Sequence, residues 1–118
     1  MLVPNSTQTD WEIELGILIG SLASRVSHES ALSSAAGYCM VNDVSERHWQ
    51  LHRNEQWGKS KSSETYTPIG PWLVSPDEIV NLQGLELRLS VNGQQWQRGH
   101  TEDLIFGAAH LIGYCSQL

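Results

Sequence analysis

Two glutamates, Glu12 and Glu14, stand two residues apart in a stretch that is otherwise apolar. In a β-strand, residues i and i+2 point to the same side and lie about 7 Å apart along the chain. Neighbouring carboxylates repel each other, so they need a cation, a proton or water between them. Their hard oxygen atoms suit Mg²⁺, Mn²⁺ or Ca²⁺. The competing interpretation of this pair is a solvated strand face.

A third carboxylate, Asp43, precedes Arg47 and Gln50 at spacings of four and seven. In a helix these spacings place all three side chains on one face. The functional interpretation is a metal-binding carboxylate beside two donors that orient a substrate carboxylate or carbonyl, a task that suits arginine. The alternative is an N-cap aspartate with a weak i,i+4 salt bridge. A cation held by three carboxylates would polarise a keto acid and stabilise an enolate, so metal-assisted carbon–carbon chemistry is the first hypothesis.

Lys61 lies in a small, polar stretch, residues 58–64, that predicts a loop, and Thr65 directly follows this stretch. A lysine there would place positive charge where an enolate or another oxyanion develops. Lys59, two residues earlier, competes for that role. For either lysine alone, a solvated surface position is the simpler interpretation.

Composition narrows the class of protein. The chain has 118 residues, which indicates one domain, and 13 acidic residues against 7 lysines and arginines give a net charge of −6. That balance argues against a nucleic-acid groove, which needs clustered basic residues. The N-terminus lacks the features of a signal peptide, and the longest apolar stretch, residues 13–23, falls short of the ~20 residues that span a bilayer. With Cys39 and Cys115 as free thiols, we expect a cytoplasmic protein that binds neither nucleic acid nor a membrane.

The first half of the chain alternates strand and helix patterns. Period-two hydrophobicity predicts a strand over residues 13–19, with the glutamates on its freer face. Residues 27–36 predict a short helix that Ser27 caps, and residues 38–42 predict a second strand. Residues 43–52 predict another helix, because Asp43 and Glu46 have the spacing of a capping box.

The second half predicts a hairpin and a long helix. Ser75 and Pro76 indicate a helix start. Alternation over residues 85–91, the turn signal Asn92-Gly93 and a returning strand over 94–97 predict a hairpin. Residues 101–116 predict the longest helix, with Thr101 as its cap. The fold class is therefore α+β, with hairpin connections and more sheet than helix.

These features occur in an order that resembles the fumarylacetoacetate hydrolase family. The resemblance covers about residues 10–117 and is closest to the branch of 2-hydroxyhepta-2,4-diene-1,7-dioate isomerase and decarboxylase and of acylpyruvate hydrolases. The segments that carry it are Glu12-Ile-Glu14-Leu-Gly-Ile-Leu-Ile-Gly20, Ala36-Gly37-Tyr38, Asn42-Asp43-Val44-Ser45-Glu46-Arg47, Gln50, Trp57, Lys61, Thr65, Pro68-Ile-Gly-Pro-Trp72, Val91-Asn-Gly93, Gln97-x-Gly99-x-Thr101 and Ile105-Phe106.

The resemblance implies a mixed, mostly antiparallel β-roll and a divalent cation, Mg²⁺ or Mn²⁺, with Ca²⁺ as a further option. It also implies a role for each of the candidate site residues. The metal ligands would be Glu12, Glu14 and Asp43, the substrate-orienting residues Arg47 and Gln50, and the enolate-stabilising residue Lys61, with Thr65 nearby. Counting back from Pro68 aligns Lys61, rather than Lys59, with the family lysine.

The sequence also departs from the family pattern. Family members carry a lid segment with a histidine–glutamate acid–base pair, which nothing upstream of Glu12 resembles. They also continue into Pro-Gly-Asp-Val and Thr-Gly-Thr-Pro segments, which this sequence does not reach before Leu118. We therefore expect residues 1–118 to form one partial family domain with uncovered strand edges and apolar faces.

Such a domain is expected to self-associate, as a symmetric dimer or a strand-exchanged one. The favoured function is a folded, catalytically impaired family member that still binds a divalent cation and a small keto acid or dicarboxylate. The alternative is an active metal-dependent hydrolase, isomerase or decarboxylase acting on 2-keto acids.

Overall fold

The computed structural model describes residues 3–53 and 56–118. Within these residues the strands form three two-stranded antiparallel sheets, in agreement with the predicted fold class. The sheets are β1 (Thr9–Asp10) with β4 (Ser45–Glu46), β2 (Ile13–Ile19) with β3 (Ala35–Asn42), and β5 (Glu86–Val91) with β6 (Gln94–His100). The helices are α1 (His28–Ala31), α2 (Arg47–His52), α3 (Trp57–Lys61) and α4 (Ala108–Cys115), and single 3-10 turns span Leu32–Ser34, Pro76–Glu78, Leu82–Gly84 and Thr101–Asp103.

The strand predicted over residues 13–19 is confirmed as β2, with Ile13 opposite Asn42 and Ile19 opposite Ala35. Its partner β3 begins at Ala35 rather than at residue 38, so the helix predicted over 27–36 was too long. That helix ends after α1 and one 3-10 turn because the Gly20 amide donates to Ser34 O and strand pairing takes over. Ser27 is the N-cap of α1, but its side chain makes no capping hydrogen bond.

The helix predicted over residues 43–52 starts four residues late, at Arg47. The Asp43 amide donates to Glu12 O, and Ser45–Glu46 pairs with β1 instead of turning into a helix. The true N-cap is Glu46, whose side chain accepts from the His48 amide. The predicted capping box was therefore wrong, and Asp43 is not on a helix face with Arg47.

The loop predicted over residues 58–64 was wrong in its first half, where α3 forms. Gln56 caps this helix by accepting from the Gly58 amide, and the Ser60 hydroxyl donates to Trp57 O. Lys61 is therefore the last residue of α3, so the helix fixes the backbone position from which its side chain extends.

The hairpin of β5 and β6 is confirmed, with Asn92 (φ 53°) and Gly93 (φ 81°) in the left-handed conformation that a tight hairpin turn requires. Strand β6 continues to His100, three residues beyond the prediction. The helix predicted over 101–116 is a 3-10 turn, a break and then α4. Thr101 does not cap α4, because its hydroxyl accepts from the Leu85 amide; Gly107 is the N-cap.

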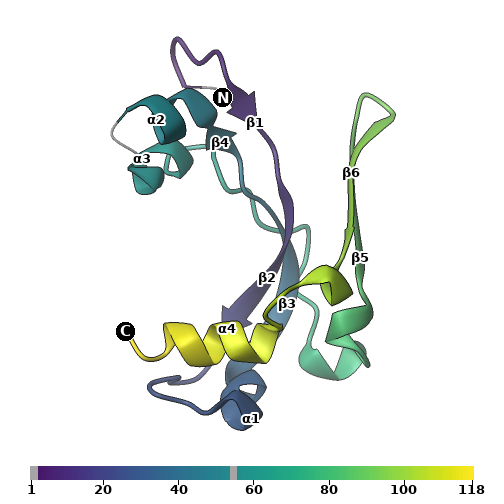
Figure 1. The fold of residues 1–118 in the computed structure, drawn as a ribbon. Helices are drawn as coiled ribbons and strands as arrows, with labels where there is room; N and C mark the ends of the chain where they lie inside the picture. The colour runs from purple at the N-terminus through teal and green to yellow at the C-terminus, as the bar shows by residue number, and fades with distance from the viewer. Residues whose placement is uncertain (1–2, 54–55) are drawn as a thin grey trace.

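Figure 1 shows an open, curved arrangement of these elements. The β2–β3 ribbon joins α2 and α3 at one end to α1 and α4 at the other, and the β5–β6 hairpin stands to one side. The radius of gyration is 15.8 Å, against about 13.5 Å for a compact domain of this length. The accessible surface is 8320 Å², about 1,900 Å² more than a compact protein of this mass exposes.

The buried apolar core is correspondingly small. Among the described residues, its members are Ala31, Tyr38, Tyr66 and Ile112. Several large apolar side chains face solvent instead, including Trp72 at 71% and Ile105 at 91% exposure. Within the described part of the chain, no helix has the length and apolar character needed to cross a membrane.

Candidate metal centre

Three carboxylates converge at the start of β2. One oxygen atom each from Glu12, Glu14 and Asp43 lies within 4.8 Å of the other two. Glu12 and Asp43 are half-buried and Glu14 is exposed. The structure therefore brings together the three residues that the sequence nominated as metal ligands, and their oxygen donor set fits a hard divalent cation.

Backbone contacts, not a helix face, place Asp43 beside the two glutamates. The Asp43 amide donates to Glu12 O at 2.8 Å, and the Glu12 amide donates to Asn42 Oδ1 at 3.1 Å. Gln97 of β6 holds the backbone between the two glutamates. Its side-chain amide accepts from Ile13 N at 2.8 Å and donates to Ile13 O at 3.1 Å. Two sheets thus fix the backbone that carries the carboxylates.

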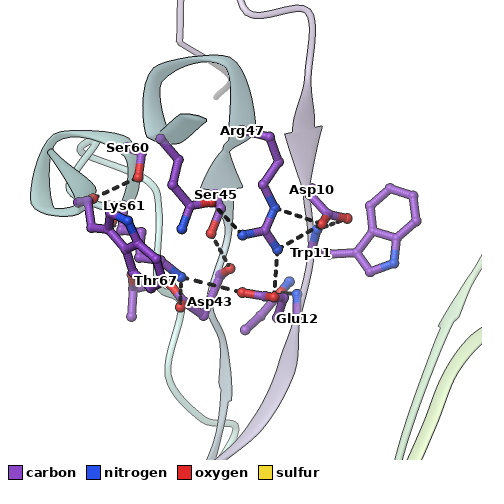
Figure 2. Close-up of polar contacts among 12 residues, drawn as sticks. Asp10, Trp11, Glu12, Asp43, Ser45, Arg47, Ser60, Lys61 and Thr67 are labelled. Carbon is purple, nitrogen blue, oxygen red and sulfur yellow. Dashed lines mark hydrogen bonds and ion pairs between the residues drawn. The ribbon is translucent and has the colours of Figure 1, made fainter. Parts of the chain in front are cut away.

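Lys61 reaches this cluster from the end of α3. Figure 2 shows its ammonium group in contact with both Asp43 and Glu12. The distance to Glu12 Oε2 is 3.4 Å. Lys59 turns away and lies 5.4 Å from the centre of the Trp49 ring. The structure therefore distinguishes the two lysines and places Lys61 at the carboxylates.

Arg47 borders the cluster on its other side (Figure 2). Its Nη2 lies 2.5 Å from Glu12 Oε1, and its Nη1 donates to Gln50 Oε1 at 2.7 Å. Gln50 is only 3% exposed, so it is a well-fixed partner. Arg47 also donates to Asp10, which the sequence interpretation missed. A signal was available, since Asp10 precedes Glu12 by two residues in the same extended segment.

The electrostatics favour an added cation. Partial desolvation, then the charges of Asp43 and Glu12, raise the pKa of Glu14, while Lys61 opposes the increase. Together Asp10, the three clustered carboxylates, Arg47 and Lys61 carry four negative and two positive formal charges, a sum of −2. A divalent cation would neutralise this excess and relieve the repulsion on Glu14.

Both basic side chains remain charged at neutral pH. Burial alone would lower the pKa of Lys61, but its contacts with Asp43 and Glu12 outweigh burial and raise it. Burial alone would also lower the pKa of Arg47, but its hydrogen bonds to Glu12 and Asp10 outweigh burial and raise it. Each group can therefore hold a negatively charged ligand.

Thr65 lies in an exposed turn between α3 and the buried Tyr66. Its role beside Lys61 stays a prediction.

Glu46 has a buried, hydrogen-bonded role that the sequence interpretation missed. It is 1% exposed and accepts hydrogen bonds from the hydroxyls of Ser6 and Thr9 and from the His48 amide. Burial alone would raise the pKa of Glu46, but these hydrogen bonds outweigh burial and hold it below the ordinary value of a glutamate. Glu46 thereby ties the segment before β1 to the start of α2, where Arg47 begins.

Comparison with known proteins identifies the family. The model of the fumarylacetoacetate (FAA) hydrolase C-terminal domain matches residues 1–118. The chain is 50% identical over 117 residues to 2,4-didehydro-3-deoxy-L-rhamnonate hydrolase of Sphingomonas sp. (strain SKA58), a match over 99% of this chain and 41% of that protein.

Solved structures of similar fold support the same family assignment. The 5-carboxymethyl-2-hydroxymuconate delta-isomerase of Mycobacterium smegmatis superposes with a TM-score of 0.90 and 33% identity, over 97% of this chain and 44% of that one. The fumarylacetoacetate hydrolase of Exiguobacterium antarcticum gives 0.91 and 29%, over 97% and 40%. The chain thus spans about two fifths of the length of the relatives it matches. It has the fold of these proteins over that part and belongs to the fumarylacetoacetate hydrolase family.

Proposed function

We propose that this chain binds a divalent cation, Mg²⁺ or Mn²⁺, with Ca²⁺ as a further option, through Glu12, Glu14 and Asp43. The observation that carries the proposal is the convergence of their oxygen atoms within 4.8 Å of one another. A hard cation prefers carboxylate oxygens, and the surplus negative charge around the cluster adds to its attraction. When bound, the cation would polarise a carbonyl oxygen of a ligand as a Lewis acid.

The ligand that best fits the neighbouring side chains is a small 2-keto acid or dicarboxylate. Arg47 presents a planar array of donors suited to a carboxylate, and the buried Gln50 fixes its orientation. Lys61 would place positive charge beside the keto oxygen as an enolate develops. Relatives named as a hydrolase and an isomerase support a hydrolase or isomerase reaction on such a ligand.

For this stretch of chain we propose binding with impaired turnover. Around the cluster, among residues 3–53 and 56–118, the carboxylates are either candidate ligands or paired with Arg47. None of the described contacts brings a histidine to the cluster. A proton acceptor separate from the cation ligands is therefore missing from the described site, and general base catalysis typically contributes 10²–10⁴-fold.

An acylpyruvate assay at saturating Mg²⁺ separates this proposal from its alternative. Binding of the keto acid with little or no turnover supports an impaired family member. Turnover that depends on Mg²⁺ and disappears in Lys61→Met supports the alternative, an active hydrolase, isomerase or decarboxylase. Absence of both binding and turnover contradicts the two proposals together.

We further propose that a second copy of the chain covers its apolar surface, as a symmetric or strand-exchanged dimer. One exposed apolar patch surrounds a cavity of about 300 Å³ lined by Leu18, Ile69, Trp72 and Leu73. The excess accessible surface is about 1,900 Å² per chain, or about 3,800 Å² for two copies, which lies within the roughly 2,000–5,000 Å² that obligate homodimers bury. Small-angle scattering should show a dimer that Trp72→Glu weakens, whereas a well-folded monomer would contradict the proposal.

A cytoplasmic location belongs to the same set of proposals. Cys39 and Cys115, the two cysteines of the sequence, are unpaired thiols, as a reducing compartment favours.

A further inference from the structure

We propose that Asp10 is a positioning residue that holds the Arg47 guanidinium in place independently of the cation ligands, so that Glu12 can bind a cation without releasing Arg47. The inference rests on the proposed cation site. It concerns a residue that the resemblance to the family did not nominate.

The contact between Asp10 and Arg47 is fixed at both ends. Arg47 Nε and Nη2 donate to the same oxygen, Asp10 Oδ2, at 3.0 and 2.9 Å. The other oxygen, Oδ1, accepts from the Trp11 amide at 3.0 Å, which sets the orientation of the carboxylate. Strand pairing places Asp10 opposite Ser45, and the Arg47 amide donates to Gln8 O at 2.9 Å. The contact between Asp10 and Arg47 is therefore made without any member of the carboxylate cluster.

Glu12, in contrast, is shared. Arg47 Nη2 lies 2.5 Å from Glu12 Oε1, and Lys61 lies 3.4 Å from Glu12 Oε2. Glu12 belongs to the group of converging carboxylates, whereas Asp10 does not. A cation that binds Glu12 withdraws negative charge from the contact with Arg47, but leaves the contacts of Arg47 with Asp10 and Gln50 intact.

The contact of Arg47 with Asp10 affects the affinity of the carboxylate cluster for a cation. Without the Asp10 charge, Arg47 has Glu12 as its remaining anionic partner among the contacts described, so the cation and Arg47 compete for one carboxylate. With Asp10 present, the competition is weaker because the guanidinium charge is already balanced. Asp10→Asn is therefore expected to weaken cation binding through Arg47, in addition to any effect of its lost charge.

A double-mutant cycle separates the two effects, with Mn²⁺ as the probe. Asp10→Asn should weaken Mn²⁺ binding about three- to fivefold, as expected for a partly exposed ion pair. In an Arg47→Met background the same substitution should change affinity less than about twofold. A penalty of equal or larger size in that background would mean that Asp10 acts only through its charge, and would overturn the proposal. Asp77→Asn, on an exposed 3-10 turn, is the matched control for net charge.

A second, spectroscopic measurement tests the positioning role of Asp10 in the absence of a cation. The Arg47 Nε proton should exchange slowly with water in the wild-type protein and in Glu12→Gln, and should exchange rapidly in Asp10→Asn. Rapid exchange in Glu12→Gln and slow exchange in Asp10→Asn would overturn the positioning role. If the protein binds no Mn²⁺ but this exchange pattern holds, the cation site fails while the orientation of Arg47 by Asp10 stands.

Discussion

Replacement of Lys61 by methionine is predicted to tighten cation binding while it removes any turnover. The Lys61 ammonium contacts Asp43 and lies 3.4 Å from Glu12, so it neutralises two of the three proposed cation ligands. A divalent cation can use those carboxylates fully only when the ammonium moves away. Methionine keeps most of the length and apolar character of the lysine stem but has no charge to displace.

The size of the effect follows from the two contacts. The side chains of Lys61 and Asp43 are 23% and 17% exposed, so the pair is better shielded than an ordinary surface salt bridge. Taking about 0.5–1 kcal/mol for each contact gives about 1–2 kcal/mol that the cation no longer has to overcome. Since 1.4 kcal/mol corresponds to a factor of ten, Mn²⁺ and Mg²⁺ should bind about 5- to 30-fold more tightly.

Isothermal titration with Mn²⁺ on Lys61→Met and Lys59→Met provides the assay and its control. Lys59 lies on the same helix and loses the same formal charge, but it faces the Trp49 ring at 5.4 Å rather than the carboxylates. Lys59→Met should therefore change the affinity less than about twofold, because a distant surface charge is largely screened. Equal gains in the two variants, or weaker binding in Lys61→Met, would refute the assignment of Lys61 as a competitor of the cation.

Three further substitutions test the site and its support. Glu14→Gln should raise the thermal stability of the cation-free protein at pH 7, because the raised pKa of Glu14 means that its charge opposes folding; the gain should vanish as the pH falls below the ordinary value of 4.5. Glu46→Gln should cost about 1–3 kcal/mol at pH 7 by leaving buried donors poorly satisfied. Because the folded pKa of Glu46 lies below 4.5, its contribution is present above that pH and is lost as the pH falls through the folded value, so denaturation curves of the wild type and Glu46→Gln should converge in acid. Gly37→Ala should cost about 1–3 kcal/mol, since an added Cβ would lie 2.6 Å from Val74 O, and equal stability would contradict the close strand approach.

The sequence predicted best those elements whose signals are local. Alternating hydrophobicity located β2, and the Asn92-Gly93 turn located the hairpin of β5 and β6, because strand periodicity and left-handed turn residues act over a few neighbours. The three carboxylates that the sequence nominated lie together in the structure, although their role as metal ligands stays a prediction.

Errors arose where distant segments override local preference. Asp43 and Glu46 have capping-box spacing, but a backbone bond from Asp43 to Glu12 and the pairing of β4 with β1 keep both residues out of a helix. These contacts join positions more than 30 residues apart, which a local pattern cannot report. Asp10 precedes Glu12 by two residues, which was a local signal, but its contact with Arg47, 37 residues away, could not be predicted from that spacing.

The most direct test of the cation site is a calorimetric titration of Mn²⁺ and Mg²⁺ into the wild-type chain and Glu14→Gln. We predict micromolar binding to the wild-type protein that Glu14→Gln abolishes, because that substitution removes one of three converging carboxylates. No binding to the wild-type chain, or equal binding to both proteins, would contradict the assignment of Glu12, Glu14 and Asp43 as a metal centre.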